Sequence, residues 1–504
     1  MVKRSGSSLT HRTLDGMLWT GGGKAARALL QLLVLAVLSR LVSAVDFGVL
    51  SAALVVIGFS QIFARLGLGP ALVQIPELEP RHLRAAFTLS VLTSFAWAAG
   101  LWLAAPAIAA FYRIHQVEPV LRALVWMFPL NGIAVVSGSL LQRELKFRWL
   151  AQREVASYLL GYGVVGIALA IAGWGVWALV WGNLAQAAVN TLLLLLGRPP
   201  SFSLWPDRRS LSELTYFSGG FTIGRIANYL ATQGDNLVTG RWLGAAALGI
   251  YGRAYQLMAV PSMLFGDVLD NVLFPSLARL QGEQARLGTA YVRGISLIAL
   301  AMLPASVILV VLSPEFIRVV LGPRWDAVVA PFQILASCML FRTSYKMSDS
   351  LSRATGSVYR RAWRQVVYAT MVIVGAWIGH FWGVTGVAAA VSLALVVNFV
   401  SMAQLSLHVC GLTWGRFLRA HGPAFALAVF CGLVAWGSVS LLRQAGLPAA
   451  VRLVVAGSLS LLTGLGLLRY RSEQFLGPEG TWMLKTLRTY VTGRFAVAPV
   501  AEQG

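Results

Sequence analysis

Charged side chains are scarce in this sequence. Only 12% of its 504 residues are Asp, Glu, Lys or Arg, whereas 57% are hydrophobic. Water-soluble domains carry about 25% charged residues, and a soluble protein of this length needs more polar surface to cover its core. The scarcity therefore excludes a water-soluble globular chain. Apolar runs of about 20 residues, the length that a bilayer-spanning helix requires, recur instead along the whole chain.

Acidic side chains are the scarcer of the two charged classes. The chain has 19 Asp and Glu against 41 Lys and Arg, which gives a formal net charge of +22. In a water-soluble protein such an excess would favour nucleic acid as the partner. In a membrane protein it is typical of loops that stay in the cytoplasm and contact anionic lipids. We therefore expect membrane lipids, and no nucleic acid, as partners.

Cysteine and histidine are also few, and their placement excludes several kinds of site. Cys338, Cys410 and Cys431 lie in apolar stretches and form no C-x-x-C pair, so we expect core residues and not disulfides or zinc ligands. The six histidines lack metal-ligand spacing, and no catalytic constellation is present. The sequence predicts no metal, no cofactor and no enzyme activity.

The apolar runs predict an all-α polytopic membrane protein with about 14 transmembrane helices. With the N-terminus assigned to the cytoplasm, 26 of the 41 basic residues fall in cytoplasmic segments and 8 in segments on the other side. This excess predicts that both termini are cytoplasmic. The expected spans are residues 17–39, 47–72, 85–110, 120–141, 155–172, 176–197, 215–240, 248–274, 290–312, 328–351, 363–381, 384–407, 421–442 and 450–469.

Two landmarks recur in the sequence and indicate an internal repeat. Residues 39–49 align with 240–250 at an offset of 201, and 174–176 align with 382–384 at an offset of 208. An even number of spans in each repeat gives the two halves parallel orientation, related by an axis along the membrane normal. We predict two parallel six-helix lobes plus two C-terminal helices: an N-lobe at 1–200, a cytoplasmic linker at 201–214, a C-lobe at 215–410, the two helices within 411–470 and a cytoplasmic tail at 471–504.

Ionisable side chains inside the expected spans are informative because each costs about 2.5–3.5 kcal/mol at mid-bilayer unless it faces a cavity or a partner. In the first span Lys24 and Arg27 share one helix face with Thr20 and Gln31. The seventh, eighth and tenth spans carry similar polar stripes. The candidate cavity residues are the basic Lys24, Arg27, Arg65, Arg225, Arg253, Arg342 and Lys346 and the acidic Asp235, Asp267, Asp270 and Asp349.

A cavity with more cations than carboxylates attracts anions, and guanidinium groups suit phosphate oxygens. The stripes therefore predict a ligand that bears phosphate or diphosphate, with the four aspartates as candidates for ion or proton coupling. Two other interpretations stay open. The charges from Arg342 to Asp349 would pair with one another and brace the helices, and Arg65 and Arg353 would extend to the membrane interface.

Several motifs carry a family resemblance. They are Asp46-Phe47-Gly48, Leu66-Gly67-Leu68-Gly69, the segment Leu141 to Arg148, Asp235-Asn236-Leu237, and the stretch from Gly240 to Tyr255. These motifs resemble those of the polysaccharide repeat-unit flippases, which belong to the multidrug/oligosaccharidyl-lipid/polysaccharide exporter superfamily. The resemblance extends over roughly residues 15–470.

The resemblance implies two six-helix lobes, a central cationic cavity and alternating access in a bacterial inner membrane. It implies a flippase that moves undecaprenyl-diphosphate-linked oligosaccharides to the periplasmic leaflet, with polysaccharide polymerase machinery as a partner. Related peptidoglycan-precursor flippases use arginines on their first, second and eighth helices, which implies that role for Lys24, Arg27, Arg65 and Arg253. Lysine at position 24 departs from that pattern.

Three alternative functions each predict a feature that distinguishes them from this hypothesis. A multidrug or cation antiporter of the same superfamily would need an acidic cavity, against the basic excess found here. A membrane polysaccharide polymerase or ligase would need larger outer loops than residues 111–119 and 313–327. A channel or scaffold would show no substrate-dependent closure.

Overall fold

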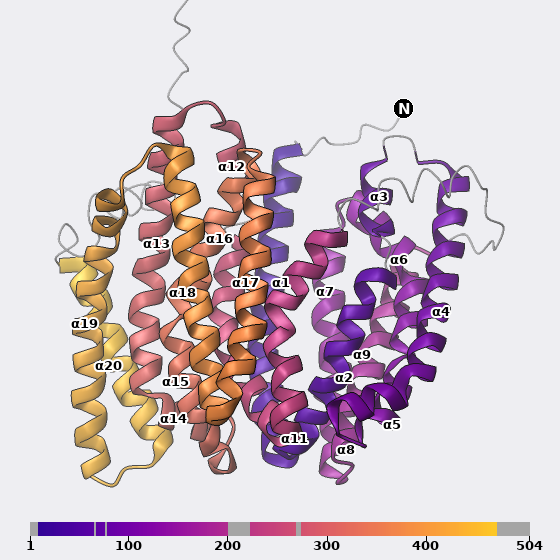
Figure 1. The fold of residues 1–504 in the computed structure, drawn as a ribbon, viewed down its shortest axis with the longest axis horizontal. Helices are drawn as coiled ribbons and strands as arrows, with labels where there is room; N and C mark the ends of the chain where they lie inside the picture. The colour runs from indigo at the N-terminus through magenta and orange to yellow at the C-terminus, as the bar shows by residue number, and fades with distance from the viewer. Residues whose placement is uncertain (1–8, 65–66, 76–77, 200–221, 269–273, 471–504) are drawn as a thin grey trace, which may run out of the picture. The chain divides into compact units, whose positions relative to one another are not determined.

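The structure, a computed structural model, describes residues 9–64, 67–75, 78–199, 222–268 and 274–470 (Figure 1). Every element within these ranges is a helix, so the expected all-α fold is confirmed. The chain divides into two compact units. The first comprises Met1–Asn271, Ile317–Leu335 and Ala362–Asn398, and the second comprises Val272–Phe316, Ala336–Arg361 and Phe399–Gly504.

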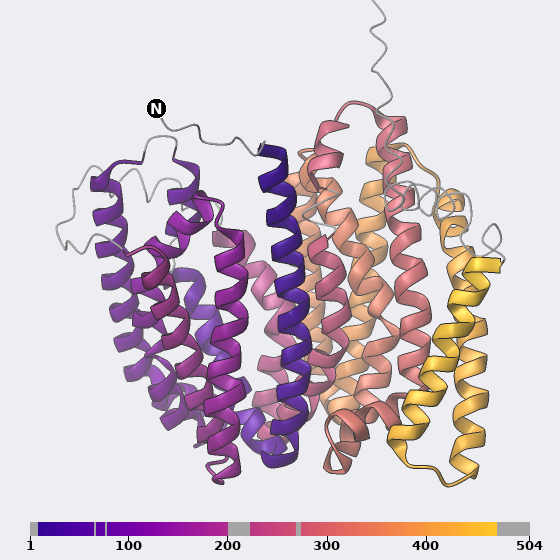
Figure 2. The ribbon, with the colours of Figure 1, turned by 180° about the vertical axis from the view of Figure 1, so that it is seen from behind.

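The first unit contains the N-terminal helices. Small residues let them pack closely: on α6, Gly132 lies against α4, where the Ser90 hydroxyl donates to the Gly132 carbonyl at 2.9 Å. Figure 2 shows the same fold from behind, with α1 drawn in indigo, and α1 packs along α7. The helices are α1 (Leu9–Leu41), α2 (Ala44–Ala64), α3 (Leu68–Gln74), α4 (Pro80–Tyr112), α5 (Val117–Leu124), α6 (Met127–Arg143), α7 (Phe147–Tyr158), η1 (Leu159–Gly166), α8 (Ile167–Ile171), α9 (Val176–Gly197) and α11 (Thr222–Val268).

The packing of α2 on α11 depends on two glycines. A Cβ atom on Gly48 would overlap the carbonyl oxygen of Ala245, and a Cβ atom on Gly249 would overlap the carbonyl oxygen of Ala44. The two contacts are equivalent under the repeat, because Gly48 aligns with Gly249 and Ala44 aligns with Ala245 at the offset of 201 residues. The reciprocal contacts agree with the predicted repeat at this point of the chain.

The helix α11 is not straight, because its backbone breaks at Gly244, where φ is 83° and ψ is −176°. A positive φ of this kind favours glycine, which has no Cβ to clash with the backbone. The break lies between the seventh and eighth expected spans, so α11 contains parts of both.

The second unit is built around α13, which packs on α16 and α19, while α19 pairs with α20. Leu312, Leu427 and Cys431 belong to its buried apolar core. All three cysteines are buried and free, which confirms the prediction that they are core residues. The helices that lie wholly in this unit are α12 (Phe274–Arg279), α13 (Gln284–Val311), α16 (Met339–Ala354), α19 (Trp414–Gln444) and α20 (Ala449–Tyr470).

Of the six remaining described helices, four include residues of both units and the two 3₁₀ helices lie wholly in the first unit. The six helices are α14 (Ser313–Val320), η4 (Pro323–Val328), α15 (Val329–Ser337), α17 (Val358–Gly379), η5 (His380–Trp382) and α18 (Gly383–Cys410). In the first unit the turn between α17 and α18 is tight, because Gly379 and Gly386 lie so close that a Cβ on either would approach the backbone of the other.

Ten helical segments of the described chain are long and apolar enough to cross a membrane, or eleven if the bent pair Pro323–Ser337 and Met339–Ala354 forms one span. The expected number of fourteen is therefore not confirmed. One reason is that α11 does not qualify, since its polar stripe lowers its hydropathy. Another is that residues Tyr359–Cys410 count as one segment, although the backbone turns at Gly383 with a φ of 68°.

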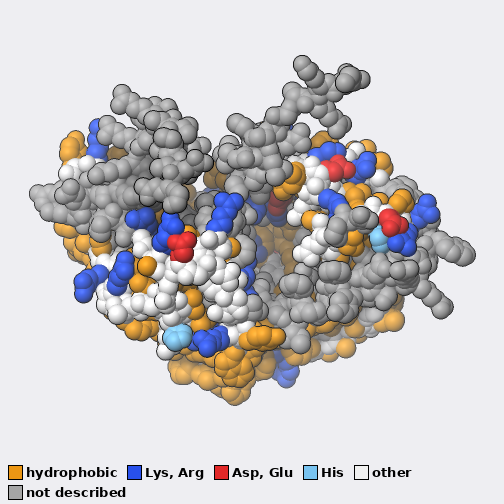
Figure 3. Space-filling model, turned by 90° about the horizontal axis from the view of Figure 1, so that it is seen from above, with side chains coloured by type: hydrophobic (Ala, Val, Ile, Leu, Met, Phe, Trp, Pro, Cys, Tyr) orange, Lys and Arg blue, Asp and Glu red, His pale blue; other side chains and the backbone are white. Residues whose placement is uncertain are grey.

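Figure 3 shows the ends of the helices from above. Basic side chains gather there with few acidic ones, while hydrophobic side chains lie around the margin. This distribution is the one expected for the cytoplasmic end of membrane helices. The sidedness of the chain stays a prediction.

Candidate functional site

A cavity of about 570 Å³ lies in the first unit between α1, α2, α7 and α11. Three of the predicted basic residues line it: Lys24 and Arg27 from α1, and Arg253 from α11. Its acidic lining residue is Glu154 from α7, and amides and tyrosines complete the polar wall. We name this cavity the cationic pocket, and its excess of positive charge suits an anionic ligand.

Arg253 is held in the cationic pocket by two contacts. Its guanidinium carbon lies 4.4 Å from the centroid of the Phe47 ring on α2, a cation–π arrangement. Its Nη1 donates a hydrogen bond to Oε1 of Gln256, one turn further along α11, at 2.5 Å. The buried Nε has no hydrogen-bond partner among the described residues. A buried donor without a partner costs about 1–3 kcal/mol, so an oxyanion at this point would be stabilised.

Arg27 makes a different set of contacts. It forms an ion pair with Glu154, and its guanidinium lies 6.0 Å from the centroid of the Tyr158 ring. The side chains of Arg27 and Glu154 are 31% and 30% exposed, so water weakens their attraction. The buried Nε of Arg27 also lacks a hydrogen-bond partner in the described chain. Arg27 thus retains a donor for a ligand while Glu154 holds its position.

The chain after Tyr158 continues as the π-helix η1, which packs on α9. Tyr158 and Tyr162 stack with ring centroids 5.3 Å apart, and the Asn183 side chain donates to the Tyr162 hydroxyl. π-Helical segments are rare and frequently accompany functional sites. The π-helix here supports the tyrosine over which Arg27 lies.

Asp235 occupies a buried position on α11. Its carboxylate accepts hydrogen bonds from the Tyr251 hydroxyl at 2.6 Å and from the backbone N–H of Asn236 at 2.8 Å. The residue is only 1% exposed. Asn236 lines the cationic pocket, whereas Asp235 is not among its lining residues. The structure thus places this aspartate behind the wall of the pocket and not on its surface.

Three further candidates lie on α16 of the second unit: Arg342, Lys346 and Asp349. Asp349 forms ion pairs with Arg353, at 3.1 Å, and with Arg361. Both partners lie outside the group from Arg342 to Asp349, whose pairing with one another stays an open alternative.

The remaining candidates cannot be placed. Arg65 and Asp270 lie outside the described residues, as do the side chains of Arg225 and Asp267.

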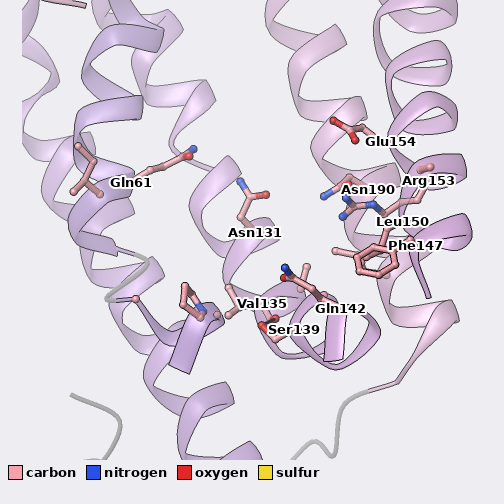
Figure 4. Close-up of a pocket in the computed structure, with 18 of the residues that line it drawn as sticks. Gln61, Asn131, Val135, Ser139, Gln142, Phe147, Leu150, Arg153, Glu154 and Asn190 are labelled. Atoms are coloured by element: carbon pink, nitrogen blue, oxygen red, sulfur yellow. Dashed lines mark hydrogen bonds between the residues drawn. The ribbon is translucent and has the colours of Figure 1, made fainter. Parts of the chain in front are cut away.

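A second cavity of the first unit, about 730 Å³ in volume, was not predicted from the sequence. Figure 4 shows Gln61 of α2, Asn131 of α6 and Asn190 of α9 directed toward one space. Gln142 also lines this cavity, which we name the amide pocket, and its charged lining residues are Arg153 and Glu154. Glu154 thus lines both pockets.

The residues of the amide pocket are weakly marked in the sequence. The four amides lie on three helices and carry no charge that sets them apart from the other polar residues of those helices. Glu154 immediately precedes an expected span that begins at residue 155, and it was therefore assigned to a cytoplasmic loop.

A family model for polysaccharide biosynthesis proteins matches residues 37–330, more than half of the chain. The chain is 26% identical over 465 residues to the teichuronic acid biosynthesis protein TuaB of Bacillus subtilis (strain 168), an alignment that covers 90% of this chain and 95% of the relative. It is 25% identical over 433 residues to the lipopolysaccharide biosynthesis protein WzxC of Escherichia coli (strain K12), with 84% and 86% covered.

The fold is similar to a solved structure of the lipid II flippase MurJ in an inward closed conformation. The TM-score is 0.71 at 12% sequence identity, and the match covers 91% of this chain and 99% of the other. At this identity the likeness establishes a common fold and leaves the ligand to be argued from the pockets.

Proposed function

Because the chain belongs to the polysaccharide biosynthesis protein family, we propose that it is a flippase for lipid-linked oligosaccharides. It carries undecaprenyl-diphosphate-linked sugar units from the cytoplasmic to the periplasmic leaflet of a bacterial inner membrane. The sugars then serve the assembly of a surface polysaccharide by polymerase machinery. A transporter of this kind breaks no bond in its substrate and needs no catalytic residue.

The observation that carries this proposal is the cationic pocket. Lys24, Arg27 and Arg253 place three positive charges around one cavity, and among its described lining residues Glu154 is the one carboxylate. A diphosphate is the part of a lipid-linked sugar that such charges recognise, since charge-assisted hydrogen bonds from arginine to phosphate oxygens are strong and directional. A pocket for cationic drugs would need the opposite balance of charge.

Alternating access supplies the transport step. The lobes at 1–200 and 215–410 rock about the bound headgroup, the sugars occupy the wet interior and the prenyl chain stays in lipid. Equal affinity for the headgroup in both conformations cannot drive net movement, so a coupled ion or the removal of product must do so. Asp235, Asp267, Asp270 and Asp349 are the proposed coupling groups, and Arg65, Arg225, Arg342 and Lys346 are proposed further contacts of the headgroup.

The experiment compares variants of two arginines on the same helix. Arg253 lines the cationic pocket, whereas Arg241 lies outside it and also makes a cation–π contact, 5.5 Å from the Phe111 ring centroid. Purified protein is reconstituted into vesicles with undecaprenyl-diphosphate-linked oligosaccharide, and protection of the sugar from an added glycosidase reports flipping.

We expect Arg253→Ala to reduce the flipping rate about 100-fold, because a charged hydrogen bond of about 1.5–3 kcal/mol is lost. Arg253→Lys should retain part of the rate, and Arg241→Ala should match the wild type. Equal rates for Arg253→Ala and wild type would place the headgroup elsewhere. A wild type that flips no lipid-linked glycan under either a proton or a sodium gradient would refute the function.

A further inference from the structure

The amide pocket is a polar cavity with no role in the binding of the diphosphate proposed above. We propose that it binds the sugar units nearest the diphosphate, as a glycan subsite beside the cationic pocket. This inference rests on the function proposed above, and it assigns a chemical class of ligand to residues that the charge pattern does not mark.

The hydrogen-bonding groups of the amide pocket match those of a sugar. Each carboxamide offers both a donor and an acceptor, and a sugar hydroxyl does the same. Asn131 uses its Nδ2 to donate to the Met127 carbonyl at 2.8 Å, which leaves its side-chain oxygen as an acceptor. Gln142 and Asn190 make no side-chain hydrogen bond to other described residues, so both amides are available.

The charge of the amide pocket also favours a neutral polar ligand. Arg153 and Glu154 contribute one positive and one negative charge, so the net attraction for an anion is small. Phe147 and Leu150 add apolar surface against which the carbon face of a sugar ring can pack. A cavity of about 730 Å³ lies in the range of about 300–1,000 Å³ that encloses small molecules.

The two pockets are neighbours within the first unit. Glu154 lines both of them, and α2 contributes Ser51 and Val55 to one and Gly58 and Gln61 to the other. Gly58 lies against the Tyr229 side chain, which lines the cationic pocket. A headgroup held by its diphosphate in the cationic pocket therefore has its sugars beside the amide pocket.

The test uses three probes: undecaprenyl diphosphate without sugar, the same lipid with the repeat oligosaccharide of the producing bacterium, and the free neutral oligosaccharide. Binding to full-length protein in detergent is measured by titration calorimetry. Flipping of the glycosylated lipid is measured in phosphatidylethanolamine–phosphatidylglycerol vesicles.

The variants are Asn131→Leu, Asn190→Leu and Gln142→Leu. Gln142 is exposed and lines the cavity, so its variant tests the subsite even if the other two fold poorly. Gln404→Leu, an exposed amide on α18 outside both pockets, is the matched control.

We expect each pocket variant to weaken binding of the free oligosaccharide and flipping of the glycosylated lipid about tenfold, because a site built to hydrogen-bond its ligand loses that much or more when one partner is removed. Binding of the bare lipid and all properties of Gln404→Leu should stay unchanged. Equal weakening of the bare and glycosylated lipids would overturn the subsite, as would unchanged glycan binding.

The two proposals can fail separately. If wild type binds the free glycan, the variants do not, and no lipid is flipped, the subsite stands and the flippase function falls. If wild type flips the lipid and the variants match it in every measurement, the function stands and the subsite falls.

Discussion

The described lining of each pocket includes four carboxamides and the carboxylate of Glu154, but the cationic pocket has three basic side chains where the amide pocket has only Arg153. Both lie in the first unit, and both use α2 as a wall. Under the proposed function, this difference would divide recognition of a lipid-linked sugar into two tasks. Charge would select the diphosphate, while hydrogen-bonding geometry would distinguish one glycan from another.

A substitution at Gly48 should disturb both pockets together and have the largest effect. A Cβ at this position would overlap the Ala245 carbonyl oxygen, so α2 and α11 must separate. We expect Gly48→Ala to destabilise the protein by about 1–3 kcal/mol or more, with loss of glycan and lipid binding alike. Thermal unfolding in detergent measures it. Gly100→Ala on α4, where no atom lies within 4 Å, is the control, and equal melting of the two variants would contradict the tight seam.

Removing two cations should affect the cationic pocket alone. We expect the double variant Lys24→Ala/Arg27→Ala to lower affinity for bare undecaprenyl diphosphate by more than about 100-fold, since charged hydrogen bonds contribute about 1.5–3 kcal/mol each. Titration calorimetry measures this affinity. Binding of the free neutral oligosaccharide should not change, because the two residues do not line the amide pocket. A parallel loss of glycan affinity would show that the pockets are not chemically separate.

Glu154 is common to both pockets, and its neutralisation should have a smaller effect of opposite sign. Glu154→Gln removes the partner of Arg27 while keeping the size of the side chain. We expect tighter binding of bare undecaprenyl diphosphate, by about twofold to fivefold for a partly exposed pair, together with slower flipping because release is delayed. Affinity and flipping rate measured on the same preparation give the test. Weaker binding would instead mean that Glu154 chiefly positions Arg27.

Glu315 belongs to the second unit and lines neither pocket, so its substitution should leave flipping at neutral pH unchanged. It is 2% exposed and accepts hydrogen bonds from Arg443 at 2.8 Å. Burial alone would raise the pKa of Glu315, but the hydrogen bonds of Arg443 and the charges of Arg443 and Arg452 lower that pKa below its ordinary 4.5. A lowered folded-state pKa means that the pair stabilises the fold above about pH 4.5, and that this contribution is lost as the pH falls through the lowered pKa.

We therefore expect Glu315→Gln to lower the melting temperature at pH 7 and to make no difference at strongly acidic pH. The control is Glu118→Gln, which removes a half-exposed i,i+4 pair with Arg122 at 3.0 Å and should change melting little. A pH-independent difference between Glu315→Gln and wild type would show that the carboxylate contributes no charge-dependent stability.

The sequence anticipated the cationic pocket better than its neighbour for a physical reason. Lys24 and Arg27 are three residues apart, and helical geometry alone puts them on one face. The prediction that Arg253 joins them required only that equivalent helices of the two repeats lie next to each other. The amides Asn131 and Gln142 lie on α6 and Asn190 lies on α9, and only the packing of α2, α6, α7 and α9 brings the three to one cavity. Asp235 was expected in a cavity, but the hydrogen bond from Tyr251 holds it in the interior.

The number of spans shows the same division. Apolar composition predicted helices throughout, and the described chain contains no other element. Composition could not determine the number of transmembrane helices. Polar residues on a helix that lines a cavity, such as α11, lower its hydropathy below that of an ordinary transmembrane helix.

By itself, the sequence determined the helical class, the buried cysteines and the charged stripes, since these follow from hydropathy and from the 3.6-residue period of a single helix. The internal repeat was also visible in the sequence, because two segments of one chain can be aligned without knowledge of the structure. Tertiary structure decided which stripe faces Glu154, which amides meet, and how Gly48 and Gly249 exchange equivalent contacts. Those features depend on distances between helices, and such distances are set by side-chain packing that no local period encodes.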